Sequence, residues 1–332
     1  MSKTLRVTFI ILIVLLIGFI SGPRVSKPQV NTELTPFQGS LDEAVEVIQR
    51  DSIENETRPG NASKFIWYND SLKNKTEYVL VYLHGFSASP EEGNPAHYYF
   101  ANRYGMNLYI PRLFEHGLKK DIPLKNFTGE GFINSAKEAI AKAKVLGDKV
   151  IIMACSTGAT AGIYIASGNP DIHALICYSP NVDLYDKTSN IITMPWGVQL
   201  SKMVIGGDIY HWDADSIRQQ YWYTDYAVES IAEMKAMLQT TMVTEVFNKI
   251  EQPLFMGYYY KNEKEQDNTV SVEKMKEMFN QLATPKTLKR RVAFPNVANH
   301  AIQNKYSSND YEAVLQETYR FAEEILDLKP IE

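Results

Sequence analysis

The chain has 332 residues, of which 45% are apolar and 22% are charged, and it carries a formal net charge of −5 at pH 7. These values are ordinary for a globular protein, so they exclude a disordered or fibrous chain. The negative balance also argues against a nucleic-acid-binding protein, because such proteins gather positive charge on one face. Two cysteines cannot build a disulfide framework or a zinc site.

The N-terminal 22 residues contain the densest run of apolar residues in the sequence. Lys3 and Arg6 precede an apolar run over residues 7–20 that only Thr8 interrupts. As a helix, with residues 21–22 included, this run spans roughly 24 Å, just short of a hydrocarbon core of about 30 Å. The pattern indicates a signal anchor or a signal peptide. It argues against a buried helix of a soluble domain, because it has no polar face.

We favour an uncleaved anchor over a cleaved signal peptide. Cleavage after Ser21 or Gly22 would place Phe19 or Ile20 where a small residue is needed. Either interpretation places the rest of the chain outside the cytoplasm, membrane-anchored or, after cleavage, secreted or periplasmic. Residues 23–39 hold three prolines among polar residues, and we predict that they form a tether.

Helix-like and strand-like segments alternate over residues 40–330, the predicted folded domain. Helices are predicted at residues 41–51, 95–103, 131–146, 158–167, 272–282 and 311–326. Strands are predicted at residues 65–68, 78–83, 107–111, 149–154, 173–178, 254–260 and 289–294. The polar turn at residues 69–75 predicts that the first two strands form a hairpin. The alternation itself predicts an α/β fold with a doubly wound, mostly parallel sheet.

Residues 181–250 lie between two predicted strands and are far too numerous for an ordinary connection. Because the segment is rich in aromatic residues and methionine, we predict a helical insertion with a small core of its own. We interpret it as a cap that lines an apolar substrate pocket, with Trp196, Trp212 and Trp222 as candidate pocket residues.

One serine stands where a predicted strand meets a predicted helix. The strand at residues 149–154 runs directly into Ser156, and small residues lie two positions before and after it, Ala154 and Gly158. A strand, a tight turn and a helix in this order are what a nucleophile elbow requires, with the serine at the strained apex. Ala154 adds one methyl group where glycine is usual. Cys155 is out of register for the nucleophile.

A candidate base and a candidate acid follow Ser156 along the chain. His300 lies six residues past the last predicted strand, in a loop from which it can take the serine proton. The loop after residue 260 holds three carboxylates, and we choose Asp267 because it lies deepest, just before the next helix. The order Ser156, Asp267, His300 is the nucleophile–acid–base order of one fold in particular. Two alternatives stay open for the acid: Glu265 and Asp183.

The strand at residues 78–83 leads into a short loop that suits an oxyanion hole. The backbone N–H groups of Phe86 and Thr157 are predicted to donate to the developing oxyanion. Donors of this kind are typically worth about 3–4 kcal/mol each in barrier. Gly85 permits a close approach, and we expect His84 to be structural because it ends a buried strand.

Together these residues resemble an α/β-hydrolase of the group related to monoacylglycerol lipases and serine aminopeptidase-like hydrolases. The resemblance implies a serine hydrolase of carboxylic esters or amides that uses no metal and no organic cofactor. It also implies a cap after the sixth strand of the family, where residues 181–250 lie. The sequence departs from the family at Ala154 and at Glu115, where many relatives have glycine. The matching positions, spread over roughly residues 64–328, are residues 82–86, 111–117 and 178–181, the elbow at Ser156, Asp267 with Val270, and His300.

The expected activity is therefore hydrolysis of a carboxylic ester with an apolar acyl or aromatic group. An aminopeptidase-like amide hydrolase is an alternative, and it would need carboxylates in the cap to hold a free amine: Asp208, Asp213 and Asp215 are candidates. A catalytically inert binding protein of the same fold is the alternative from another class. The expected partners are a small-molecule ester and, through the N-terminal segment, the membrane.

Overall fold

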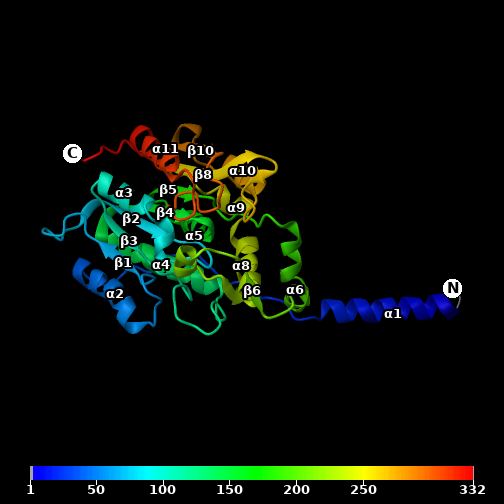
Figure 1. Cartoon of the computed structure of the whole chain (residues 1–332). Helices are drawn as coiled ribbons and strands as arrows, with labels where there is room; N and C mark the ends of the chain where they lie inside the picture. Colours follow the sequence, from blue (N-terminus) through cyan, green and yellow to red (C-terminus); the bar gives the residue numbers. More distant parts are fainter. Residues whose placement is uncertain (1–2, 332) are drawn as a thin grey trace.

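The computed structural model describes residues 3–331 and places an eight-stranded sheet at the centre of the body (Figure 1). The strand order is β1-β3-β2-β4-β5-β8-β10, with β9 paired to the end of β8. Every pair is parallel except β1 with β3 and β8 with β9. The strands are β1 (Lys64–Ile66), β2 (Thr76–Leu83), β3 (Asn107–Ile110), β4 (Gly147–Cys155), β5 (Ile172–Tyr178), β8 (Leu254–Asn262), β9 (Glu265–Gln266) and β10 (Lys289–Phe294).

The predicted strands and helices of the body are all found, with ends within three residues of the expected ones. The predicted hairpin between the first two strands is wrong. β1 pairs antiparallel with β3, with Phe65 opposite Tyr109, because β3 and β4 already occupy the two sides of β2. The three residues of β1 are half-buried or exposed, which suits an edge strand.

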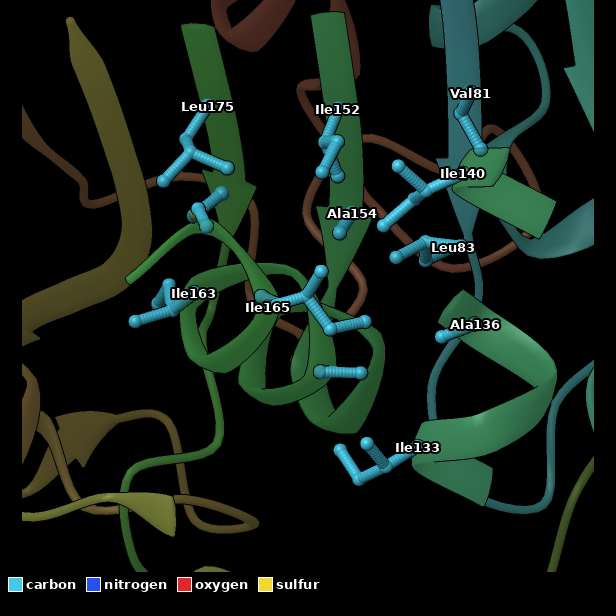
Figure 2. Packing of buried hydrophobic residues seen from close by; sticks show 14 of the residues in the cluster. Val81, Leu83, Ile133, Ala136, Ile140, Ile152, Ala154, Ile163, Ile165 and Leu175 are labelled. Atoms are coloured by element: carbon cyan, nitrogen blue, oxygen red, sulfur yellow. The ribbon is translucent and has the colours of Figure 1, made fainter. Parts of the chain in front are cut away.

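Two hydrophobic cores fill the two faces of the sheet, and β2 contributes to both. Val79, Val81 and Leu83 join one core, whereas Leu80 and Tyr82 join the other. A strand buried on both faces needs a continuous apolar run, which is what the sequence has there. Figure 2 shows side chains of the first core gathered between helices and strands. The helices on the first face are α2 (Leu41–Glu54), α4 (Gly129–Leu146), α5 (Ser156–Ala166) and α10 (Val272–Gln281); those on the second are α3 (Ala96–Arg103) and α11 (Tyr311–Glu324).

The long insertion follows β5, and helices make up most of its regular structure, as predicted. It also contains a two-stranded antiparallel ribbon that the sequence analysis does not anticipate, since its strands have three residues each. Two further single turns of 3-10 helix lie outside the insertion, at Pro90–Gly93 (η1) and Lys286–Leu288 (η3). The elements of the insertion are η2 (Lys187–Thr193), α6 (Gly197–Ile205), β6 (Ile209–His211), α7 (Ser216–Tyr221), β7 (Asp225–Ala227), α8 (Val228–Thr241) and α9 (Thr244–Phe247).

The N-terminal apolar run forms helix α1 (Lys3–Ile20), which projects away from the body (Figure 1). None of its residues is buried, and among the described helices it is the one long and apolar enough to cross a membrane. Residues 23–39, the predicted tether, form neither helix nor strand. They nevertheless lie against the body, because Val30, Leu34 and Phe37 pack on the first core.

Candidate active site

Ser156 occupies the turn between β4 and α5. Its backbone φ is 54°, a left-handed conformation that a residue with a side chain adopts only under strain. Gly158 makes the turn possible, because a Cβ there would lie 2.1 Å from the carbonyl oxygen of Leu83 and 2.5 Å from that of His84. The extra methyl group of Ala154 is buried in the first core, so the departure from glycine is accommodated. The strand, the strained turn and the helix thus have the geometry that a nucleophile elbow requires.

His300 and Asp267 form a hydrogen-bonded pair. The distance from Nδ1 of His300 to Oδ2 of Asp267 is 2.6 Å, and the carboxylate is completely buried. The second carboxylate oxygen accepts hydrogen bonds from the backbone N–H groups of Thr269 at 2.9 Å and Val270 at 3.1 Å. Because the ionised carboxylate can only accept, Nδ1 carries a proton and Nε2 of the neutral ring is the free acceptor.

Electrostatics at this pair favour a basic imidazole. Burial lowers the pKa of His300, but the charge of Asp267 and its hydrogen bond outweigh burial, so that the net change is upward. Nε2 is buried and makes no hydrogen bond to any residue from 3 to 331. An acceptor of this kind can take a proton from a hydroxyl group brought to it.

The segment that follows β5 joins the elbow to the histidine loop. The hydroxyl of Ser179 donates to the carbonyl of His300 at 2.7 Å, and the N–H of Asn181 donates to the carbonyl of Ser156 at 3.1 Å. Both candidate residues therefore lie at the edge of the sheet where the parallel strands end. No hydrogen bond joins Oγ of Ser156 to Nε2 of His300 among the contacts of the described residues, and such contacts commonly tighten on substrate binding.

The two alternative acids lie elsewhere. Asp183 forms an ion pair with Lys235, whose side chain is buried in the insertion. Glu265 is exposed and bonds to Lys261 at 2.8 Å. Of the three candidates, only Asp267 contacts His300.

The loop at residues 84–89 carries Phe86 and packs tightly on the elbow. A Cβ at Gly85 would lie 2.9 Å from Cβ of Ser156, so only glycine allows this approach. Ser87 has a φ of 62°, and its carbonyl accepts a hydrogen bond from the N–H of Tyr223 at 2.7 Å. The ring of Phe86 makes edge-to-face contacts with Phe127 and Tyr226. These contacts hold the 84–89 loop, with Phe86, beside Ser156.

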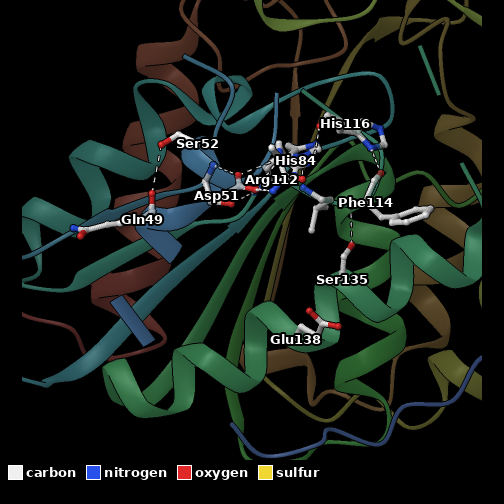
Figure 3. Close-up of polar contacts among 12 residues, drawn as sticks. Gln49, Asp51, Ser52, His84, Arg112, Phe114, His116, Ser135 and Glu138 are labelled. Atoms are coloured by element: carbon white, nitrogen blue, oxygen red, sulfur yellow. Dashed lines mark hydrogen bonds and ion pairs between the residues drawn. The ribbon is translucent and has the colours of Figure 1, made fainter. Parts of the chain in front are cut away.

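Residues 111–117 fix the 84–89 loop through buried polar contacts (Figure 3). The Arg112 guanidinium forms an ion pair with Asp51 at 2.7 Å and donates to the carbonyl of His116 at 3.0 Å. Nε2 of His116 accepts from the N–H of Ser87 at 3.0 Å, while its Nδ1 donates to the carbonyl of Phe114. Burial keeps the pKa of His116 well below its usual value, so the ring is a neutral acceptor.

His84 has a structural role, as expected. Its Nδ1 donates to the carbonyl of Gly85 at 2.9 Å, and its Nε2 accepts from the N–H of Leu113 at 3.0 Å. Burial lowers the pKa of His84 to about 4. With both ring nitrogens engaged, it is not a candidate for the base.

Glu92 is a buried acid beside the candidate site, and the sequence does not predict it. Its Oε2 accepts hydrogen bonds from the N–H of Gly85 at 2.8 Å and from the hydroxyl of Tyr82 at 3.0 Å. Burial raises the pKa of Glu92 to about 7, although the hydrogen bond from Gly85 and the charge of His300 act in the opposite direction. In the sequence, Glu92 belongs to a short acidic stretch beside a proline, a pattern typical of an exposed turn.

The three candidate tryptophans do not gather in one place. The indole N–H of Trp212 donates to the carbonyl of Tyr223 at 3.0 Å, and Tyr223 is the residue whose N–H donates to Ser87. Trp222, the neighbour of Tyr223 in the chain, is almost completely buried. Trp196 instead lies beside the end of α1, where its indole N–H donates to the carbonyl of Gly18 at 3.1 Å. The structure therefore brings two of the three to the 84–89 loop.

Known structures share this architecture over most of the chain. The structure of the metagenome-derived lipolytic enzymes LipS and LipT aligns with a TM-score of 0.64 at 15% identity and covers 80% of this chain and 98% of that chain. The chain has the α/β-hydrolase fold.

Two other structures support the same assignment of the fold. Est1E from Butyrivibrio proteoclasticus with bound ferulic acid aligns at 17% identity, with a TM-score of 0.55, over 80% of this chain and 95% of that chain. An esterase of Pyrococcus furiosus aligns at 15% identity, with a TM-score of 0.54, over 92% of this chain and 98% of that chain. No protein-family model matches the sequence, and no curated protein matches it either. In this chain, the turn at Ser156 follows β4 and the insertion follows β5.

Proposed function

We propose that the chain is a serine hydrolase that cleaves carboxylic esters through an acyl-enzyme. The observation that carries the proposal is the Asp267–His300 pair at 2.6 Å, with its buried and unpaired Nε2, at the same edge of the sheet as the strained Ser156 elbow. The neighbouring structures described as lipolytic enzymes and esterases support it through their shared fold.

In the proposed mechanism, Oγ of Ser156 forms a bond to the ester carbonyl carbon while its proton moves to Nε2 of His300. Asp267 orients the imidazole and stabilises its positive charge. The carbonyl oxygen becomes an oxyanion, which the N–H groups of Phe86 and Thr157 stabilise. When the tetrahedral intermediate collapses, the C–O bond breaks and the alcohol leaves with the proton from His300. Water then repeats the sequence on the acyl-enzyme and releases the carboxylic acid.

The surroundings of the 84–89 loop favour an ester with an apolar acyl or aromatic group. Phe86 and Tyr226 present aromatic rings there, and Trp212 and Trp222 pack nearby. Burial of aromatic surface around a few polar groups is typical of a pocket for small apolar ligands. Est1E, one of the structural neighbours, has ferulic acid bound, an aromatic carboxylic acid that fits the same chemical class.

The aminopeptidase-like alternative lacks a free carboxylate among its candidates. Asp208 pairs with Lys202 at 2.8 Å, and Asp215 caps α7 and pairs with Arg218 at 2.7 Å. Asp213 is fully exposed and contacts His211 at 3.3 Å. Because these carboxylates have partners, the ester is the better supported substrate. Turnover of an aminoacyl p-nitroanilide faster than of a p-nitrophenyl ester would reverse this preference.

We also propose that α1 is an uncleaved anchor and that the body lies outside the cytoplasm. The support is the 18-residue helix itself, which has no buried residue, carries Lys3 and Arg6 ahead of its apolar run and is followed by a chain that packs on the body. Basic residues before such a helix favour the cytoplasmic side.

Turnover of p-nitrophenyl butyrate by the full-length chain tests the catalytic proposal. Ser156→Ala should lower the rate roughly 10³-fold or more, because the nucleophile is lost. Ser71→Ala, at an exposed serine between β1 and β2, is the matched control and should keep the wild-type rate. Unchanged turnover in Ser156→Ala would refute the mechanism.

A further inference from the structure

Helix α6 of the insertion turns three large apolar side chains outward, while its Val198 packs on the small core of the insertion. Leu200, Met203 and Val204 are 43%, 77% and 89% exposed. On the opposite side of the helix, Lys202 forms ion pairs with Asp208 and Glu229 of the insertion, and its side chain is only 26% exposed. A surface helix of a soluble protein shows the reverse pattern, with apolar residues toward the core.

The exposed apolar residues of α6 continue onto the segment before it. We define the cap patch as the large apolar residues between positions 191 and 205 that are each more than 40% exposed: Ile191, Met194, Trp196, Leu200, Met203, Val204 and Ile205. They belong to η2, α6 and the short connection between them. An exposed patch of this kind, built from large side chains that lie close along the chain, marks an interaction surface.

The end of α1 is attached to the cap patch. The N–H of Trp196 donates to the carbonyl of Pro23 at 2.8 Å, and its indole N–H donates to the carbonyl of Gly18 at 3.1 Å. Val25, a few residues after α1, packs against the core of the insertion, which Ile192, Val228 and Ala232 form. Figure 1 shows α6 at the side of the body from which α1 projects. A surface fixed at the end of a helix that enters a bilayer lies at the surface of that bilayer.

We propose that the cap patch lies in the interfacial layer of the bilayer into which α1 inserts. The occupant of the patch is the lipid surface itself, because the patch is continuous with an apolar helix that needs hydrocarbon around it. Trp196, at the junction, is the residue type that favours the boundary between headgroups and acyl chains. The body is thus held with its cap against the membrane, and this orientation does not depend on the proposed catalytic function.

Quenching by spin-labelled lipid tests the proposal on the full-length chain. Val204→Cys, carrying an environment-sensitive fluorophore, is reconstituted as one chain per phosphatidylcholine nanodisc, with or without lipid bearing a nitroxide near the headgroup. The native thiols of Cys155 and Cys177 are buried, so the label goes to the introduced cysteine. Leu72→Cys, an apolar position 69% exposed in the turn between β1 and β2, is the matched control. In Figure 1, β1 and β2 lie on the side of the body away from α1.

Nitroxide lipid should lower the fluorescence at position 204 at least threefold and leave position 72 unchanged. Leu200→Cys should give the same result as Val204→Cys, so a single poorly folded variant does not decide the outcome. Equal fluorescence at position 204 in plain and nitroxide lipid would overturn the proposal, and so would equal quenching at positions 204 and 72. A patch that binds a second copy of the chain would show no quenching in a disc that holds one chain.

Discussion

Replacing Glu92 by glutamine should remove a large part of the pH dependence of stability. In the folded chain, the Glu92 carboxyl is buried with a pKa of about 7, compared with an ordinary value of 4.5. The protonated form is therefore favoured by folding. Its contribution to stability is fully present below pH 4.5 and is lost as the pH rises through about 7.

The two pKa values set the size of the effect. At about 1.36 kcal/mol per pH unit, the carboxyl contributes roughly 3 kcal/mol that is lost between pH 4.5 and pH 8, of which about 2.5 kcal/mol is lost between pH 5 and pH 8. Glutamine stays neutral over this range, and its amide oxygen can still accept from the N–H of Gly85 and the hydroxyl of Tyr82. Compared with wild type, Glu92→Gln should gain about 2.5 kcal/mol of unfolding free energy on going from pH 5 to pH 8.

Urea unfolding of the detergent-solubilised chain, followed by tryptophan fluorescence at the two pH values, measures this difference. Glu251→Gln, at an exposed glutamate, is the control and should change with pH as wild type does. If Glu92→Gln and wild type lost the same unfolding free energy between pH 5 and pH 8, the argument from burial would be refuted.

Three further substitutions test the geometry of the site. Gly158→Ala should cost about 3 kcal/mol of unfolding free energy or prevent folding, since its Cβ would lie 2.1 Å from the Leu83 carbonyl oxygen; wild-type stability in urea would contradict this. Asp267→Asn should lower kcat roughly 10⁴-fold. It should also lower the pKa of His300, because the charge of Asp267 raises that pKa, so the midpoint of the pH profile of the remaining kcat/KM should shift to lower pH than in wild type. Ser156→Gly should abolish hydrolysis but raise the unfolding free energy by about 1 kcal/mol, because glycine relieves the φ of 54°; a loss of stability would argue against strain.

Much of the fold could be predicted because it depends on local patterns. The apolar run of β4 and the small residues around Ser156 specify a buried strand followed by a tight turn, and the structure contains both. The pairing of the strands is harder to predict, because the sequence of β1 does not show which other strand has an unpaired edge. The ribbon of β6 and β7 has only three residues in each strand, too few for a periodic signal.

The sequence likewise predicts some features of the candidate site and not others. The depth of Asp267 in its loop favours it over Glu265 without excluding Glu265, and of these two only Asp267 contacts His300 in the structure. Glu92 was not predictable, because its burial follows from the close packing of the 84–89 loop on the elbow and no spacing in the sequence reports that. The outward direction of the large apolar side chains of α6 could not be predicted either, because an amphipathic pattern does not show which side of a helix faces the body.

Reaction of the full-length chain with a fluorophosphonate probe tests the central claim most directly. The probe reacts with an activated serine, and peptide mass spectrometry then locates the adduct. The account predicts one adduct per chain on Ser156, with loss of ester hydrolysis in proportion to labelling and no adduct in Ser156→Ala. A chain that stays unlabelled while folded would instead be an inert member of the fold. An adduct on another serine, with hydrolysis intact in Ser156→Ala, would contradict the account.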